Sequence, residues 1–557
     1  MKKFVFVSII LSFINVSSAI DENNNLDKAG GRFLLKQECG SNRDLVVANY
    51  KNNQKYEIKC KDNYSLYNSK SANKFYNKKK AIDGKKIKIL NFNLLYPGQS
   101  NTRYKNYKLI ANIINRYDII SGLELLGSTG SDNKINYNVL QEISKLKSLK
   151  NRVDISAHIS KDPNALESLK IGRSLVEQKI LKLMAVYKKP GYLKLFEELK
   201  KLDPSWSLII STNNKIEKSG GVQELVGFYF KAKKVKLFSN QYCKEVYGRS
   251  SGIPYACTPK FSKDFFGIDA KFVFSRLPFM ANFESGNFDF TIIASHVAFR
   301  TPKKTETVNK ILKTAFGVNN IAELKGTGIR IDTYSRFAEI KLTMDLIKKM
   351  TKSYSEKDII FAGDFNVESQ NKFWKNPLMS KGVDLKLLVN EKTTLAKKTR
   401  LNSGGSIIDD GYSKNYDHFM INPKITSECD TKSAGRVDFI NDENIKKIID
   451  IDYIIRNKTL VAGLLYSIHK NAKDIISKRT AELKADLRKE KKILYSQIVP
   501  RYTQEEEDLI IFNYHRRVFE SQMNSATYYR VYAELISDHA PIEISCSTNR
   551  EDDDQKK

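Results

Sequence analysis

The sequence lacks several features that assign a chain to common protein classes. It has six cysteines in 557 residues, with no Cys-x-x-Cys pair and no Cys/His cluster, which argues against a structural zinc site. No segment of 20–50 residues repeats, which argues against a solenoid. After the N-terminus there is no run of about 18 apolar residues, so we expect a soluble mature protein without stable membrane insertion.

Acidic residues are scarce relative to basic ones. The chain has 94 Lys and Arg against 63 Asp and Glu, a net charge of +31. A bias towards Lys in the source would raise the count of bases, but it would not by itself produce a deficit of acids. A field of this sign attracts polyanions, which are either nucleic acid or an anionic membrane surface.

The N-terminus has the pattern of a secretory signal peptide. Lys2 and Lys3 precede an apolar segment from Phe4 to Val16, and small residues at 17–19 form a cleavage site. We therefore expect a secreted or periplasmic protein, cleaved near Ala19, whose net charge is 31 − 2 = +29.

The cysteines are even in number, which in an exported chain favours disulfides. Pairing does not follow from sequence alone. Closeness along the chain favours Cys39–Cys60 and Cys243–Cys257, and this leaves Cys429 with Cys546.

The distribution of strand-like and helical segments indicates one decorated domain. Residues 20–84 are polar and form an expected N-terminal extension, and residues 548–557 form a charged tail. Strand, helix and strand follow one another between residues 86 and 126, the order of a layered α/β domain. We predict a domain over residues 85–547, with Lys-rich helical insertions at about 130–204 and 440–525. A near-heptad seam marks the second insertion, at Ile476, Leu483, Leu487 and Leu494.

Polar side chains recur where the predicted strands end. Each has an ordinary explanation as a turn former, a helix cap or a packed residue, but their recurrence at strand ends does not follow from turn chemistry. In layered α/β folds, catalytic and ligand-binding groups gather at such ends. The residues concerned are Asn93, Glu124, Glu224, His296, Asp364, Asn366, Asp417, Asp538 and His539.

In chain order, the motifs around these residues resemble the endonuclease/exonuclease/phosphatase superfamily, most closely the secreted deoxyribonuclease I-like branch. The resemblance extends over residues 86–546 and leaves both insertions out. It implies a four-layer α/β/β/α sandwich. The motifs are FNLL, GLELL, QELVGFYFK, FSRLP, IIASHVA, AGDFN, YDHFMI and SDHAPIEI.

The resemblance implies a pair of catalytic histidines. His296 and His539 would flank the scissile phosphate, one accepting a proton from water and the other protonating the leaving oxygen. Glu224 would orient His296, and Asp417 would orient His539. His418 should face away from the site, because neighbours on a strand alternate sides.

The resemblance also implies a metal site made of oxygen ligands. Such ligands suit Mg²⁺, with Mn²⁺ or Ca²⁺ as alternatives. Arg276 would neutralise the phosphate. The metal and phosphate ligands would come from Glu124, Asn93, Asp364, Asn366 and Asp538.

Three positions depart from the family pattern. Leu123 replaces a supporting Gln before the metal-binding Glu, Leu126 replaces an Arg that enters the minor groove, and Val222 replaces a Tyr that packs on a sugar. These differences put the mode of duplex binding in doubt and leave the predicted chemistry intact. We expect the Lys-rich insertions to contact phosphates instead.

The sequence thus predicts a monomeric, metal-dependent phosphodiesterase, with DNA cut at low sequence specificity as the first hypothesis. Two alternatives remain. The same fold could hydrolyse phospholipid head groups, as sphingomyelinases and inositol phosphatases do. A catalytically inactive, polyanion-binding module is the other alternative.

Overall fold

The computed structural model describes residues 45–51, 54–58, 76–95, 105–126, 130–186, 191–211, 224–238, 240–247, 255–299, 301–380, 382, 384–396, 411–448 and 528–551, and positions 481–482, 485, 509 and 513. Four features of the sequence lie outside the described residues. They are the predicted signal peptide, the predicted pair Cys39–Cys60, Val222, and all four residues of the near-heptad seam in the second predicted insertion.

Eight strands in the described part of the chain form one sheet, which we call the first sheet. Within it, β3 is parallel to β4 and antiparallel to β15. The strands β1 and β2 fall in the segment expected to be an extension, and β1 pairs with β5 in parallel at the edge of this sheet. The order across the sheet is β14 (Cys429–Arg436), β15 (Ile542–Ser547), β3 (Lys86–Asn93), β4 (Ile119–Leu126), β6 (Glu224–Lys231), β5 (Trp206–Ser211), β1 (Leu45–Lys51) and β2 (Gln54–Ile58).

The remaining described strands form a second sheet. Its strands β10 and β11 run parallel, in a register that places His296 opposite Asp364. The strand β13 pairs with β11 in the opposite direction, so that Asp417 also lies opposite Asp364. The order is β12 (Lys386–Leu387), β13 (Asp417–Ile421), β11 (Ile359–Asp364), β10 (Phe288–His296), β9 (Phe279–Ser285) and β7 (Lys236–Leu237), with β8 (Ala256–Cys257) also paired to β9.

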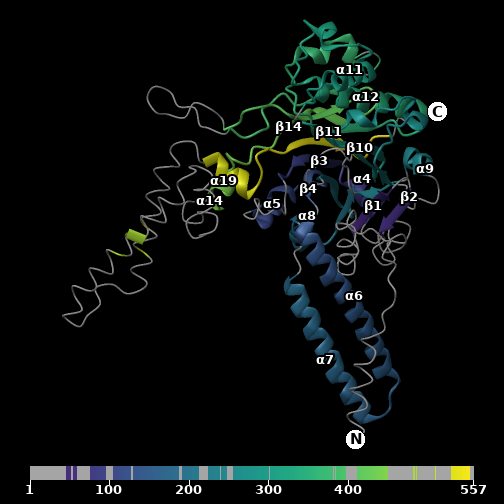
Figure 1. The fold of residues 1–557 in the computed structure, drawn as a ribbon, viewed down its shortest axis with the longest axis vertical. Helices are drawn as coiled ribbons and strands as arrows, with labels where there is room; N and C mark the ends of the chain where they lie inside the picture. Colours follow the sequence, from purple (N-terminus) through teal and green to yellow (C-terminus); the bar gives the residue numbers. More distant parts are fainter. Residues whose placement is uncertain are drawn as a thin grey trace, which may run out of the picture. The chain divides into compact units, whose positions relative to one another are not determined.

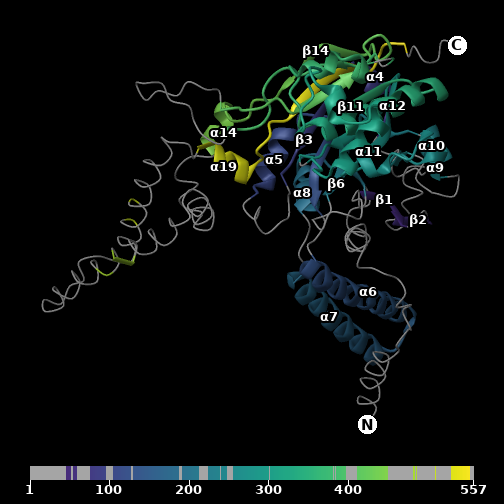
Figure 2. The ribbon, with the colours of Figure 1, turned by 45° about the horizontal axis from the view of Figure 1, so that its top comes forward.

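The two sheets pack face to face and carry helices on their outer sides (Figures 1 and 2). Alternation along the strands divides the apolar side chains between two cores. Phe228, Phe283 and Ile292 lie in the core between the sheets. Ile293 and Phe361 point the other way and pack under the outer helices of the second sheet. The predicted four-layer α/β/β/α class is therefore confirmed.

The outer helices differ between the two sides of the sandwich. On the first sheet, α8 (Gly191–Leu202) packs against β4 and β5 and against α5 (Tyr107–Ile114). On the second sheet, α11 (Thr305–Phe316) and α12 (Tyr334–Ser353) pack together. The shorter described helices are α4 (Lys78–Asp83), α9 (Gln241–Tyr247), α10 (Lys263–Phe266), α13 (Pro377–Ser380), α14 (Glu443–Ile448) and α19 (Tyr528–Leu535).

Gly363 allows β10 and β11 to approach closely at the end that carries His296 and Asp364. A Cβ atom at this position would lie 2.0 Å from the carbonyl oxygen of Ser295. Only glycine fits without moving one of the strands. The glycine of the AGDFN motif therefore has a packing role next to the polar residues that follow it.

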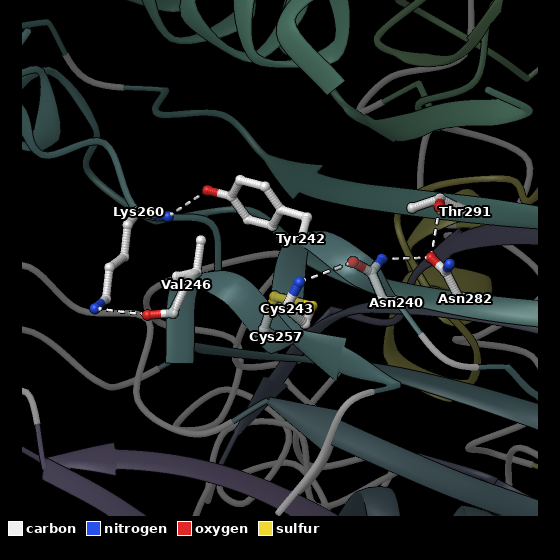
Figure 3. Close-up of a disulfide and its surroundings, with 8 residues drawn as sticks. All are labelled: Asn240, Tyr242, Cys243, Val246, Cys257, Lys260, Asn282 and Thr291. Atoms are coloured by element: carbon white, nitrogen blue, oxygen red, sulfur yellow. Dashed lines mark hydrogen bonds between the residues drawn. A yellow bond between two sulfur atoms is a disulfide. The ribbon is translucent and has the colours of Figure 1, made fainter. Parts of the chain in front are cut away.

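Two of the three predicted disulfides lie in the described residues and are confirmed. Cys243–Cys257 joins α9 to β8, beside hydrogen bonds from Asn240 to Asn282 and from the Cys243 amide to Asn240 (Figure 3). Cys429–Cys546 joins β14 to β15, where the two residues are register partners. Both bridges anchor strands of the sandwich.

Two long helices lie in the segment of the first predicted insertion. The helices α6 (Gly130–Ile159) and α7 (Pro163–Val186) pack against each other and belong to a compact unit separate from the sandwich. Leu146, Leu169 and Val176 are buried in this unit. Among the described helices, none is both long enough and apolar enough to cross a membrane.

Candidate active site

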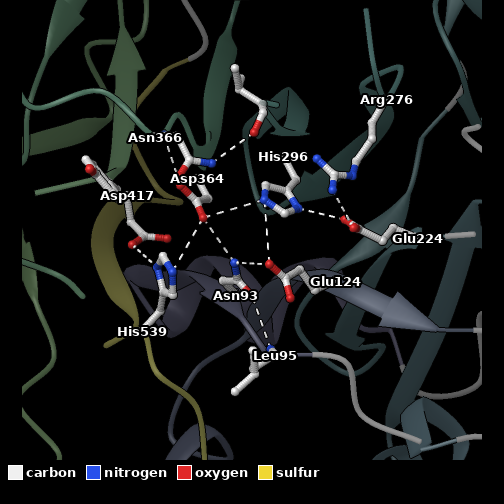
Figure 4. Close-up of polar contacts among 12 residues, drawn as sticks. Asn93, Leu95, Glu124, Glu224, Arg276, His296, Asp364, Asn366, Asp417 and His539 are labelled. Carbon is white, nitrogen blue, oxygen red and sulfur yellow. Dashed lines mark hydrogen bonds and ion pairs between the residues drawn. The ribbon is translucent and has the colours of Figure 1, made fainter. Parts of the chain in front are cut away.

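Eight of the nine polar residues predicted at strand ends, all except Asp538, lie in one cluster of polar contacts (Figure 4). Asp364, at the end of β11, is the central member. Its Oδ2 accepts a hydrogen bond from Asn93 Nδ2 at 3.1 Å. The same oxygen lies 3.7 Å from Nε2 of His296 and 3.6 Å from Nε2 of His539. One buried carboxylate thus faces both imidazoles, and the two sheets meet at it.

His296 ends β10 and is held by a carboxylate on its other ring nitrogen. Its Nδ1 lies 2.7 Å from Oε2 of Glu224, the first residue of β6. The guanidinium of Arg276 donates to the second oxygen of Glu224 at 2.5 Å. Arg276 therefore lies next to the site, bound to Glu224, and its predicted contact with phosphate remains a proposal.

His539 is oriented in the same manner from the other side. Its Nδ1 lies 2.7 Å from Oδ2 of Asp417, which also accepts a hydrogen bond from the hydroxyl of Thr393 at 2.7 Å. Thr393 accepts the backbone N–H of Asp417 as well. The sequence contains no signal for Thr393, because it lies in a loop far along the chain from both partners.

The loop that carries His539 is fixed by three further hydrogen bonds. The Ser537 hydroxyl donates to the carbonyl of Asn93 at 2.6 Å, and the His539 amide donates to that hydroxyl at 3.2 Å. Buried Lys105 donates to the carbonyl of Ile536 at 2.6 Å, at the end of α19. Burial lowers the pKa of Lys105 to about 8, although Asp538 opposes this change. No motif in the sequence predicts a role for Lys105.

Glu124 reaches the site through an irregularity in β4. The register between β4 and β6 shifts between Gly122 and Leu125, and Glu124 has a φ of 55°. A bulge of this kind redirects a side chain that regular alternation would place elsewhere. Oε1 of Glu124 accepts from Asn93 at 2.9 Å and lies 3.6 Å from Nε2 of His296. Leu123, which departs from the family pattern, is buried between the sheets.

Strained backbone is concentrated at the site. Of the non-glycine residues with positive φ in the described chain, Leu95, Glu124 and Asn366 lie in or beside it, and Lys85 does not. Such conformations are unfavourable for residues other than glycine and tend to occur at functional sites. Surrounding contacts therefore have to hold them.

Asn366 is held in this way by its neighbours on three sides. The backbone N–H of Asn366 donates to Oδ1 of Asp364 at 3.0 Å, and its side-chain Nδ2 donates to the carbonyl of Val297 at 2.9 Å. Arg336, on α12, donates to the Asn366 carbonyl at 2.6 Å. Arg336 is only 7% exposed, and Glu339 is buried three positions after it on the same helix. Charged residues within an amphipathic helix are a signal that the sequence does contain, although it does not reveal the partner.

The electrostatics of the two histidines are dominated by opposing effects. Burial and Arg276 lower the pKa of His296, but Glu224 and Glu124 outweigh them, and the pKa is raised above its ordinary value. Burial also lowers the pKa of His539, but Asp417 and Asp364 raise it well above its ordinary value. Both imidazoles are therefore biased towards the protonated form by carboxylates.

His418 behaves as predicted and lies outside this cluster of contacts. Its Nε2 lies 2.8 Å from the carbonyl of Val367, and its ring packs near Phe365 and Trp374. Burial lowers its pKa to about 4, so it is neutral at ordinary pH. It has a packing role.

The donor set fits a hard divalent cation. Glu124, His296 and Asp364 offer ligand atoms within 4.8 Å of one another, and so do Asp364, Asp417 and His539. Three buried carboxylate oxygens have no hydrogen-bond partner among the described residues: Glu124 Oε2, Asp417 Oδ1 and Asp538 Oδ1. Buried, unpaired carboxylate oxygens are costly without a cation.

The pKa of Glu124 is consistent with a site built for positive charge. Burial, with smaller contributions from the charges of Glu224 and Asp538, raises the pKa of Glu124 to about 7, although His296 opposes this change. A divalent cation would favour the ionised form. Oxygen donors of this kind suit Mg²⁺, Mn²⁺ or Ca²⁺.

No family model and no curated protein matches the chain. Among solved structures, it is similar to the catalytic domain of human Nocturnin, with 10% identity over 61% of this chain and 82% of that chain, and a TM-score of 0.27. It is similar to an endonuclease/exonuclease/phosphatase family protein from Leptotrichia buccalis, with 13% identity over 64% and 94% and a TM-score of 0.30. It is also similar to truncated Caenorhabditis elegans TDP2, with 10% identity over 61% and 84% and a TM-score of 0.27.

Proposed function

We propose that this chain is a secreted, divalent-metal-dependent phosphodiesterase, and that it acts as a DNA endonuclease of low sequence specificity. The observation that carries the proposal is the pair of imidazoles, each held by a carboxylate on Nδ1, whose Nε2 atoms both face Asp364. The family resemblance of the motifs and the excess of basic residues support the choice of substrate.

The arrangement supports an in-line hydrolysis. One of His296 and His539 accepts a proton from water at Nε2 as the water oxygen bonds to phosphorus. The other donates a proton to the ester oxygen as its bond to phosphorus breaks. Glu224 and Asp417 hold the rings in the required tautomer and stabilise the charged form. Proton transfer of this kind contributes about 10²–10⁴ to the rate.

The oxygen ligands supply the rest of the site. Glu124, Asp364 and Asp538 would hold the cation, and the amides of Asn93 and Asn366 would orient phosphate oxygens. When bound, the cation stabilises the negative charge that develops on the phosphate and the leaving oxygen. Positioning and charge stabilisation have to supply most of the acceleration, because phosphodiester hydrolysis is slow without a catalyst.

Plasmid cleavage tests the proposal. Purified protein should cut plasmid DNA with Mg²⁺, and a chelator should stop the cutting until metal is restored. His296→Ala and His539→Ala should each lower the rate by at least about 10² while DNA retention changes little. Intact plasmid under all metal conditions would refute the nuclease. Hydrolysis of phospholipid head groups by the same preparation would support the lipid alternative, and retention of DNA without hydrolysis would support the inactive module.

A further inference from the structure

Phe299 is an exposed aromatic residue three positions after His296. Its side chain is 61% exposed, which is unusual for a phenylalanine. A single exposed apolar residue is common and does not by itself indicate a function. Phe299 differs from such residues because its contacts connect it to the candidate active site.

Arg336 connects Phe299 to the residues that surround Asp364. One guanidinium nitrogen donates to the Phe299 carbonyl at 2.9 Å, and another donates to the Asn366 carbonyl at 2.6 Å. The guanidinium carbon lies 4.8 Å from the centroid of the Phe299 ring. A cation at this distance is attracted by the ring. The ring is therefore supported by a buried cation while most of its surface remains open to solvent.

The chain after Phe299 is held against the start of α12. The Thr301 hydroxyl donates to the carbonyl of Asp332 at 2.8 Å, and the Tyr334 hydroxyl donates to the carbonyl of Pro302 at 3.0 Å. These contacts hold the segment beside Phe299 in place. Ordering a platform before it binds lowers the entropic cost of binding.

We propose that Phe299 is a stacking platform for a base of the substrate strand next to the scissile phosphate. The inference rests on the proposed function. A flat ring, supported by Arg336 and three positions after His296 along the chain, suits a planar ligand, and bases stack on aromatic rings irrespective of sequence. Exposed Lys303 and Lys304 follow on the same segment and would contact the adjoining phosphates.

A membrane surface suits these residues less well. In the described residues that follow β10 and those that directly precede α12, the exposed large apolar side chains are Phe299 and Ile331. Interfacial anchoring scales with the apolar area that is buried, and two side chains provide little. The support from Arg336 also holds the ring in place instead of leaving it free to insert.

Binding of short strands in the presence of chelator tests the platform without cleavage. The probes are a fluorescent single-stranded thymidine 12-mer and the same strand with abasic sites in place of the bases. Phe299→Ala and Phe299→Leu should weaken binding of the thymidine strand by about tenfold, the effect of losing one stacked base. Phe299→Tyr should bind as the wild type does, and all variants should bind the abasic strand equally.

Ile268→Ala is the matched control. Ile268 is 44% exposed, and it follows α10, whose Phe265 carbonyl accepts from Lys349 near the far end of α12. Lys349 lies thirteen residues after Arg336, or about 20 Å along the helix. This variant should bind both strands as the wild type does.

Several outcomes would overturn the platform. If Phe299→Leu binds the thymidine strand as tightly as the wild type does, stacking is not involved. If the variants lose affinity for the abasic strand to the same extent, Phe299 contacts the sugar–phosphate backbone and not a base. Loss of binding to anionic phospholipid vesicles, with strand binding intact, would assign Phe299 to a membrane. If strand binding depends on Phe299 but plasmid remains uncut, the proposed function fails and the platform stands.

Discussion

Replacing Asp417 by asparagine tests how the site supports the charge of its second histidine. Oδ2 of Asp417 accepts two hydrogen bonds, from His539 Nδ1 and from the Thr393 hydroxyl, both at 2.7 Å. In Asp417→Asn, an amide oxygen in the position of Oδ2 can accept both hydrogen bonds, and the NH₂ group takes the position of Oδ1. The orientation of the ring is therefore kept, and the negative charge beside Nδ1 is lost.

The loss of this charge is expected to lower kcat. Removal of the carboxylate lowers the pKa of His539, because Asp417 is the first of the groups that raise it. A ring that holds its proton less tightly is a weaker base, and it is protonated in a smaller fraction of molecules. We expect kcat to fall by about 10², the lower end of what positioned proton transfer contributes, which corresponds to about 3 kcal/mol in the barrier.

The assay is steady-state plasmid or oligonucleotide cleavage with saturating Mg²⁺ across a range of pH. Asp384→Asn is the control, because it removes one exposed carboxylate just before β12, the strand that pairs with β13. Asp417→Asn should retain the thermal midpoint and DNA binding of a folded protein. A kcat within threefold of the wild type at every pH would refute the assigned role of Asp417 in stabilising protonated His539.

Three further predictions concern stability. Gly363→Ala should cost about 1–3 kcal/mol and lower kcat, because the new Cβ would meet the Ser295 carbonyl at 2.0 Å; an unchanged thermal midpoint would contradict this. Burial raises the pKa of Glu339 from 4.5 to about 7. The neutral side chain therefore makes its full contribution to the free energy of unfolding below pH 4.5, and this contribution is lost as the pH rises through 7. Glu339→Gln should therefore gain at most about 3 kcal/mol over the wild type at pH 8 and little at pH 4, in urea denaturation, and an equal effect at both pH values would exclude this titration. Replacing Cys429 and Cys546 by serine should lower the free energy of unfolding by about 4–5 kcal/mol, because the bridge closes a separation of 117 residues; a loss below about 1 kcal/mol would contradict the loop-entropy reasoning.

Sequence alone identified the residues that gather at the candidate active site. Strand periodicity and polar residues at strand ends are local properties, and Asp364 and His296 each end a recognisable apolar strand. Because parallel neighbours such as β10 and β11 end at the same edge of a sheet, this local pattern also predicts proximity. The alternation of strands and helices indicated a layered α/β domain, and the family resemblance of the motifs implied the four-layer sandwich.

Only the tertiary structure decided which groups support those residues. Thr393, Ser537 and Arg336 contact site residues 24, 444 and 30 positions away along the chain, and these pairings depend on how the sheets and helices pack. The bulge that directs Glu124 and the exposure of Phe299 likewise arise from packing. Local periodicity contains no information on such contacts, because they depend on the arrangement of distant segments in space.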